Sequence, residues 1–102
     1  MKKNVLKLPI FSTGQTMGVE FEKVLTKKKS AFQDIVIVDT VEFGKCLVID
    51  DVMQAAEVDH HMYDGQLIGL LRKKDANILI LGGGDGYVAE AVLQKNPQAH
   101  VT

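Results

Sequence analysis

The residues best suited to chemistry lie in a glycine-rich segment toward the end of the chain. Residues 77–81 are polar at the first position and apolar at the rest, and they precede the loop 82–86, Gly-Gly-Gly-Asp-Gly. A continuous apolar run indicates a parallel strand buried on both faces, and glycines let the backbone turn sharply close to a ligand. A helix is expected over residues 86–95, ended by Asn96 and Pro97. The segment therefore predicts the first strand–loop–helix unit of a nucleotide-binding α/β fold.

The carboxylate of Asp85 limits the classes of ligand that this loop is expected to bind. The dinucleotide pattern G-x-G-x-x-G is met at Gly82 and Gly84 but has Tyr87 at its third glycine. A carboxylate at a helix N-terminus disfavours a phosphate and favours a cation or a hydroxyl group. We therefore expect the loop to bind a nucleoside with positive charge and no pyrophosphate, such as a sulfonium S-adenosyl compound. The alternative is that Asp85 only caps the helix.

Composition and charge exclude several classes of partner. The chain has 102 residues, a net charge of -1 and 46% hydrophobic residues, which gives no argument for nucleic acid or a membrane surface. It contains no apolar run long enough to cross a membrane and no signal peptide pattern. The lone Cys46 is expected to be a buried thiol and fits a cytoplasmic location. Adjacent His60 and His61 would not share a helix face, so no metal site is expected.

The chain divides into two parts with different hydrophobic patterns. Residues 1–57 predict an antiparallel β meander, with strands over 19–25, 35–41, 46–49 and 52–56. The turns between the later strands are expected at 42–45 and 50–51, and the lysines 27–29 are expected in a solvated loop.

Residues 58–102 show helical spacing first and then the strand–loop–helix unit. A helix capped by Asp59 is expected to run to about residues 73–75, where basic residues suit a helix C-terminus. A second parallel strand would open at 99–101. The prediction is thus an α/β chain in two domains, 1–57 and 58–102.

Short motifs along the chain, in the same order, resemble those of the spermidine synthases, the polyamine aminopropyltransferases. The resemblance lies in the segments 30–35, 43–50, 51–54, 57–63 and 82–86. It covers about residues 18–95. Each motif alone is weak, and the resemblance is specific because all five occur in the same order along the chain.

The resemblance implies a fold and an activity. The fold would be a small N-terminal β domain, engaged in oligomerisation and substrate lining, followed by the start of a truncated Rossmann-like domain of the methyltransferase type. The activity would be transfer of an aminopropyl group from decarboxylated S-adenosylmethionine to putrescine or a related amine. No cofactor would be needed, because decarboxylated S-adenosylmethionine is a co-substrate of the reaction. The enzyme would be a cytoplasmic homodimer or homotetramer.

The resemblance also implies roles for individual residues. Gln33 and Asp85 would contact the aminopropyl donor, together with the glycines of the loop. Tyr63 would line the pocket for the acceptor amine, and Asp64 lies at a neighbouring position of that pocket. Gln54 is a weaker candidate. The general base, an aspartate, is expected beyond Thr102.

The sequence departs from the family pattern at several of these positions. Asp64 stands where the family has histidine or glutamine, and Gly65 stands where it has glutamate. Tyr87 replaces a glycine, and His60 with His61 replaces an acidic–aromatic pair. A carboxylate at position 64 would pair with a protonated amine, so it predicts either a different acceptor or a changed or lost activity.

Because the general base lies outside it, the 102-residue chain by itself is predicted to be inactive. Exposed strand edges would invite self-association or a partner chain. Two alternatives stay open: a non-catalytic oligomerisation module derived from the family, and a fragment of an S-adenosylmethionine-dependent methyltransferase. Gln33 and Tyr63 argue against the methyltransferase.

Overall fold

The computed structural model describes residues 3–102, which form two compact units. The first unit extends to Val58, and the second runs from Asp59 to Thr102. Within the described residues, no helix has the length and apolar character needed to span a membrane.

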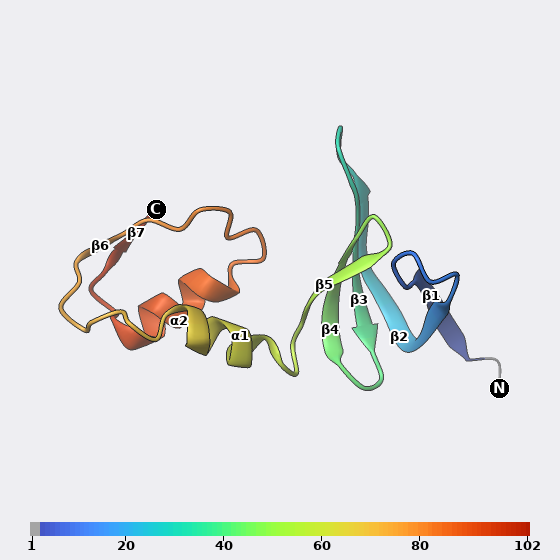
Figure 1. Ribbon diagram of the computed structural model, residues 1–102, viewed down its shortest axis with the longest axis horizontal. Coiled ribbons are helices and arrows are strands. Elements are labelled where there is room, and N and C mark those ends of the chain that lie inside the picture. The colour runs from blue at the N-terminus through green and yellow to red at the C-terminus, as the bar shows by residue number, and fades with distance from the viewer. Residues whose placement is uncertain (1–2) are drawn as a thin grey trace. The chain divides into compact units, whose positions relative to one another are not determined.

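The first unit is one antiparallel sheet in the order β1-β2-β3-β4-β5 (Figure 1). Its strands are β1 (Asn4–Pro9), β2 (Thr16–Lys29), β3 (Asp34–Thr40), β4 (Gly44–Ile49) and β5 (Val52–Ala56). Each strand pairs with its neighbour along the chain, so the predicted meander is confirmed. β1 and β5 also contact each other, which shows that the sheet curls.

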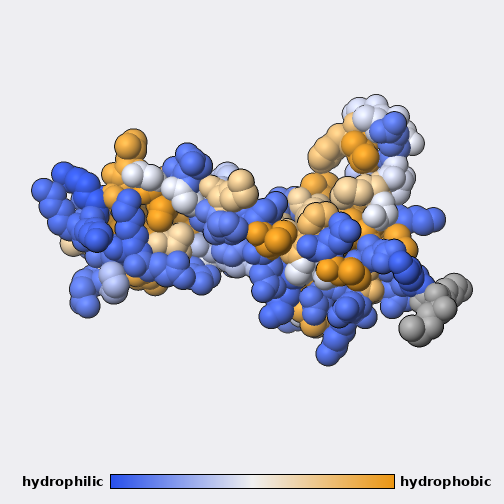
Figure 2. Space-filling model, turned by 90° about the horizontal axis from the view of Figure 1, so that it is seen from below, coloured by the Kyte–Doolittle hydropathy of each residue, from blue (hydrophilic) through white to orange (hydrophobic). Residues whose placement is uncertain are grey.

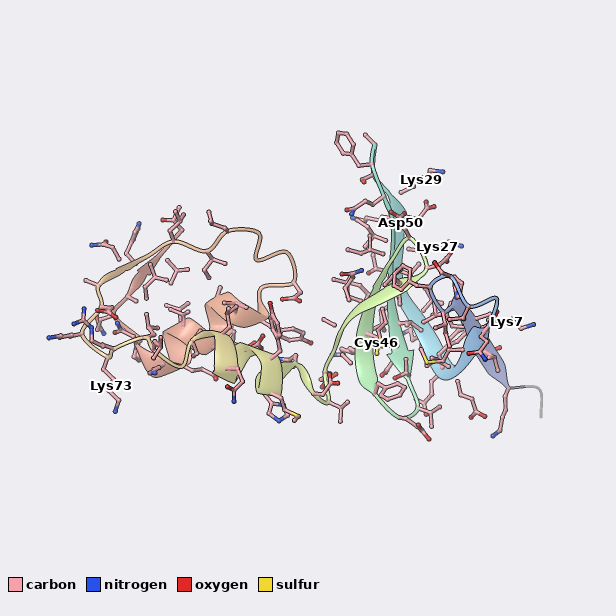
Figure 3. The ribbon with its side chains drawn as sticks, in the orientation of Figure 1. Lys7, Lys27, Lys29, Cys46, Asp50 and Lys73 are labelled. Carbon is pink, nitrogen blue, oxygen red and sulfur yellow. The ribbon has the colours of Figure 1, made fainter. Side chains whose placement is uncertain are left out.

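Alternate residues of the strands build the core of this sheet. Cys46 and Val48 of β4 are buried, and Val38 of β3 lies opposite Cys46 in the strand register. The remaining members of the buried cluster come from the other strands: Leu8, Val19 and Ala56. Successive strand residues point to opposite faces, so these side chains share the inner face of the curled sheet. The burial of Cys46 that the sequence predicts is confirmed (Figure 3).

Two tight turns set the register of the last three strands. Thr40 Oγ1 donates to the carbonyl of Gly44 at 2.8 Å and accepts from the backbone N–H of Phe43 at 3.0 Å. Gly44 has a φ of 68°, a left-handed conformation that glycine adopts without steric cost. Asp50 and Asp51 have φ values of 49° and 63°, as in a type I′ hairpin turn. Both predicted turns are therefore confirmed, although the first lies at residues 41–43 and residues 44 and 45 belong to β4.

The first unit differs from the prediction at two places. The loop predicted at 27–29 is wrong, because these lysines belong to β2 and pair with residues 34–36 of β3. Antiparallel pairing with β3 satisfies alternate backbone amides of this segment, which outweighs the weak strand preference of lysine. Figure 3 shows Lys27 and Lys29 on this hairpin. In addition, β1 forms where no strand is predicted, and it pairs with residues 16–21.

The second unit contains two short helices and a small parallel sheet. Its elements are α1 (His60–Leu67), β6 (Asn77–Ile78), α2 (Tyr87–Lys95) and β7 (His100–Val101). β6 and β7 are parallel neighbours, and the Ile80 N–H extends their pairing by donating to the carbonyl of Thr102 at 2.8 Å. The predicted strand–loop–helix–strand order is therefore confirmed.

The strand before the glycine loop is shorter than predicted. The structure assigns strand only to Asn77–Ile78, and Leu79 and Leu81 are 69% and 87% exposed. The prediction of a buried strand over the whole of 77–81 is therefore wrong for this chain. A parallel strand is buried only when helices cover both faces of a wider sheet, and the described residues supply only β7 as its neighbour.

Helix α1 also ends earlier than predicted, at Leu67 instead of near residue 73. Gly69 explains the difference, because it lies inside the predicted helix just beyond the observed end of α1 and glycine is a poor helix former. Asp59 occupies the predicted N-cap position but makes no capping hydrogen bond through its side chain.

The turn that follows α1 is held by Asp75. Its carboxylate accepts from the backbone N–H of Arg72 at 2.9 Å and from Arg72 Nε at 3.1 Å. These bonds, the backbone bond first, lower the pKa of Asp75 from its ordinary value of 3.8. The amide of Asn96, just after α2, donates to the Asp75 carbonyl and ties the turn to the end of that helix.

Candidate functional site

The glycine loop between Ile78 and Tyr87 has the backbone geometry of a close turn. Gly82, Gly83 and Gly86 have φ values of 94°, 68° and 81°, which residues with a Cβ atom rarely adopt. At Gly83 a Cβ atom would also lie 3.0 Å from Ile80 Cγ2. The loop therefore needs its glycines to turn from the parallel sheet into α2.

Asp85 lies in this loop and uses one carboxylate oxygen locally. Its Oδ1 accepts a hydrogen bond of 2.9 Å from the backbone N–H of Tyr87, the first residue of α2. Gly86 is the N-cap residue of α2, so Asp85 contacts the helix start from the position before the N-cap that the alternative assigned to it. The Asp85 carboxylate also places negative charge beside the loop, so the bond is compatible with the predicted contact to a cationic donor.

The two predicted acceptor-side residues differ sharply in exposure. Tyr63 is 68% exposed, whereas Asp64, the next residue of α1, is 4% exposed. A buried carboxylate needs a partner to offset lost hydration. Asp64 Oδ2 has that partner in His60 Nδ1, at 2.6 Å and one helical turn earlier.

His60 also contacts the first residue of α2. Its ring stacks on that of Tyr87, with centroids 3.5 Å apart and planes 7° from parallel. A hollow of about 540 Å³ opens between α1 and α2, and its lining includes His60, Asp64, Tyr87 and Glu90. The carboxylates and the aromatic ring of this hollow suit recognition of an amine, and Lys95 adds one positive charge to the same lining.

The other predicted site residues lie in the first unit. Gln33 is in the turn between β2 and β3, where its backbone N–H donates to Ser30 Oγ at 2.9 Å and its carbonyl accepts from Ser30 N. Gln54 is an exposed residue of β5. Their roles at the donor stay predictions, as do those of Tyr63 and the glycines.

Among the predicted site residues, the structure connects Asp64 and Asp85 through a series of contacts. Asp64 and Asp85 belong to one unit and are linked through His60 and Tyr87. The sequence prediction missed the part played by His60. The signal was present, because His60 and Asp64 are four positions apart, the spacing at which side chains meet on a helix. Among residues 3–102, no cluster of at least three His, Cys, Asp or Glu side chains is arranged to hold a metal ion.

Comparison with known proteins gives the same family over most of the chain. Residues 10–57 match the family described as the spermidine synthase tetramerisation domain. Polyamine aminopropyltransferase 1 of Hyperthermus butylicus is 34% identical over 101 residues, covering 94% of this chain and 35% of the relative. Spermidine synthase of Dictyostelium discoideum is 34% identical over 87 residues, covering 82% of this chain and 31% of the relative. The chain thus spans about a third of the length of these relatives.

The fold comparison agrees with the sequence comparison. The crystal structure of spermidine synthase from Thermotoga maritima superposes with a TM-score of 0.79 at 22% identity, covering 96% of this chain and 36% of that one. At that identity the likeness concerns the fold, which here is the antiparallel sheet followed by the helices and the parallel strand pair.

The sequence comparisons define the class as that of the polyamine aminopropyltransferases, and the fold agrees with it. Within this class, the chain belongs to the spermidine synthase family and corresponds to its N-terminal portion, with the tetramerisation domain at residues 10–57. The predicted family is therefore confirmed.

Proposed function

We propose that the chain forms the N-terminal part of an enzyme that transfers an aminopropyl group from decarboxylated S-adenosylmethionine to putrescine or a related amine. The observation that carries the proposal is the β6–glycine loop–α2 unit, with Asp85 at the helix start. It occurs in a chain that is 34% identical to a polyamine aminopropyltransferase over 94% of its length.

The donor is a sulfonium compound with a terminal ammonium group, and the loop offers it complementary charge. Asp85 is the carboxylate of this loop, and charge-assisted hydrogen bonds are the strong ones. In the reaction the acceptor nitrogen forms a bond to the carbon beside sulfur, the carbon–sulfur bond breaks, and the sulfur leaves as a neutral thioether. The acceptor nitrogen then gives up a proton to a general base.

We assign that general base to a residue outside this chain. The carboxylates of the candidate site already accept hydrogen bonds: Asp64 from His60, Asp85 from the N–H of Tyr87, and Glu90 from Gln94. The resemblance to the family supports the same assignment. The proposal needs no cofactor beyond the donor itself.

The exposed leucines of the second unit support a Rossmann-like continuation of the sheet. Leu79, Leu81 and Leu70 are strongly exposed, and a hollow of about 440 Å³ is lined by apolar residues of α1, α2 and the segment around β6. Figure 2 shows apolar atoms at the molecular surface among polar ones. Further parallel strands and helices would cover such a surface, as parallel sheets require.

The test is a transfer assay with the protein in the longest form in which it is expressed. The protein is incubated with decarboxylated S-adenosylmethionine and putrescine, and the products are detected by mass spectrometry. The expected products are spermidine and 5′-methylthioadenosine. Asp85→Asn should lower kcat/KM by at least about tenfold, because a charge-assisted contact is lost, while Asp39→Asn on β3 serves as the control. Absence of transfer to any of a series of diamines would refute the proposal.

A second function, oligomerisation without catalysis, is favoured by one specific observation. The family match at residues 10–57 is to a tetramerisation domain and covers most of the five-stranded sheet. In that case the protein would associate without turning over the donor. The assay above and a measurement of molecular mass separate the two functions.

A further inference from the structure

Four residues of the second unit form a continuous series of contacts. Asp64 Oδ2 lies 2.6 Å from His60 Nδ1, and the His60 ring stacks on Tyr87 at 3.5 Å. The backbone N–H of Tyr87 donates to Asp85 Oδ1 at 2.9 Å. The series joins α1, which carries the predicted acceptor-side carboxylate, to the glycine loop, which carries the predicted donor-side one.

We propose that His60 is a positioning residue that couples the acceptor side of the candidate site to its donor loop. The assignment of the two sides rests on the proposed function, whereas the coupling itself rests on the contacts alone. His60 would act through Asp64 and Tyr87, without itself touching a substrate.

The chemistry of the pair fixes the orientation of the His60 ring. An ionised carboxylate only accepts hydrogen bonds, so Nδ1 of His60 carries the proton that points to Asp64. Asp64 is almost fully buried, so it cannot exchange this partner for water without cost. Stacking on Tyr87 constrains the same ring through its face. Two independent contacts thus hold one ring.

A functional consequence follows for the acceptor. An ammonium group that donates to Asp64 Oδ2 would compete with His60 for that oxygen. Displacement of His60 would also disturb its stack on Tyr87, and hence the N-terminal turn of α2 and the hydrogen bond to Asp85. By linkage, a ligand at the loop must then alter the affinity for an amine at Asp64, and the reverse.

The first experiment needs no substrate, so it is independent of the proposed function. The 102-residue chain is labelled with ¹⁵N, the imidazole nitrogens of His60 are assigned, and amide hydrogen exchange is measured at Tyr87 and Glu90. Wild-type His60 should show a proton on Nδ1. In His60→Ala the exchange at these amides should be about tenfold faster, because the His60 ring that packs on Tyr87 at the start of α2 is lost. His100→Ala, which alters a histidine of β7 outside this series of contacts, is the matched control and should leave exchange unchanged.

Two further variants separate the contacts and guard against simple unfolding. His60→Phe keeps a ring for Tyr87 but no donor for Asp64, and His60→Asn keeps a donor but no ring. Each should raise the exchange at Tyr87 by less than His60→Ala does. Asp64→Asn should also raise it, and should have no added effect in a His60→Ala background, since the influence of Asp64 would pass through His60.

Three results would overturn the coupling. The first is a His60 ring protonated only on Nε2. The second is exchange at Tyr87 that is the same in His60→Ala and His100→Ala. The third is an Asp64→Asn effect that persists undiminished without His60. A failed transfer assay combined with the expected exchange pattern would refute the proposed function and leave the coupling intact.

Discussion

At the scale of single residues, the least expected feature is how much of the second unit depends on polar side chains. Two polar residues, Asp64 and Asn96, are buried there in addition to the apolar Val92. Each polar group has a partner, His60 for Asp64 and the Asp75 carbonyl for Asn96. Because a small apolar core is supplemented by hydrogen bonds, single polar substitutions should have clear effects on stability.

The lowered pKa of Asp75 predicts how the stability of the second unit depends on pH. The folded state holds this carboxyl ionised through the backbone N–H and guanidinium of Arg72. Its contribution is therefore complete above the unfolded-state pKa, near the ordinary 3.8, and is lost as pH falls through the lower folded-state value.

Urea unfolding followed between pH 2 and pH 7 checks this expectation. Asp75→Asn should unfold at lower urea than wild type at pH 7, and the difference should shrink toward pH 2. Arg72→Ala keeps the backbone donor and should show a smaller effect. Equal destabilisation of Asp75→Asn at both ends of the pH range would contradict the assignment.

A second residue-scale prediction concerns the core of the sheet. Val38 is 1% exposed and faces Cys46, whereas Val41 is 56% exposed. Val38→Ala should lower the free energy of unfolding by about 2 kcal/mol, the cost of deleted methyl groups and the cavity they leave. Val41→Ala removes the same atoms at the surface and should change it by less than about 0.5 kcal/mol. Chemical denaturation monitored by circular dichroism measures both, and equal effects would show that Val38 is not in the core.

At the scale of elements, the turns depend on backbone geometry that only certain residues tolerate. Gly44 has a φ of 68°, and a Cβ atom there would lie 3.1 Å from Glu57 Cβ. Gly65 lies inside α1, and a Cβ atom there would meet no atom within 4 Å.

Alanine at these two glycines should therefore act in opposite directions. Gly44→Ala should destabilise the protein by about 1–2 kcal/mol, because an L-residue is strained at positive φ. Gly65→Ala should stabilise it by about 0.5–1 kcal/mol, because alanine is the better helix former. Thermal unfolding of both variants makes the comparison, and a shift of the same sign in both would refute it.

The elements also show which parts of the structure the sequence could predict. The turns at Gly44 and Asp50 were predictable, because glycine and aspartate identify left-handed backbone positions locally. The strand at 27–29 and the end of α1 were not. Three lysines look like a loop until the pairing with β3 is known, and a spaced set of leucines looks like a longer helix although Gly69 follows Leu67 closely.

The candidate site shows the same division. The glycine loop and Asp85 were predictable, since their chemistry is contained in consecutive residues. The stack of His60 on Tyr87 was not, because it joins residues 27 positions apart in sequence (87 − 60) and depends on how α1 packs against α2.

At the scale of the whole molecule, the family match to a tetramerisation domain leads to a prediction about assembly. We expect the 102-residue chain, of 11.2 kDa, to form a homo-oligomer, a dimer or tetramer, through the five-stranded sheet. Light scattering coupled to size-exclusion chromatography should give a mass at a multiple of 11.2 kDa. A mass of a single chain at all concentrations would contradict the expectation.

The order of the sheet has a further consequence for how the chain reaches its structure. Every strand of the first unit pairs with the strand next to it in sequence, so hairpins can form one after another as the polypeptide emerges, with little loop entropy lost at each step. The contact between β1 and β5 is the exception, since it spans the whole unit. Closure of the curled sheet should accordingly be the slow step of folding. A chain that ended before β5 would form only four strands, and the apolar inner face of the sheet would stay partly exposed.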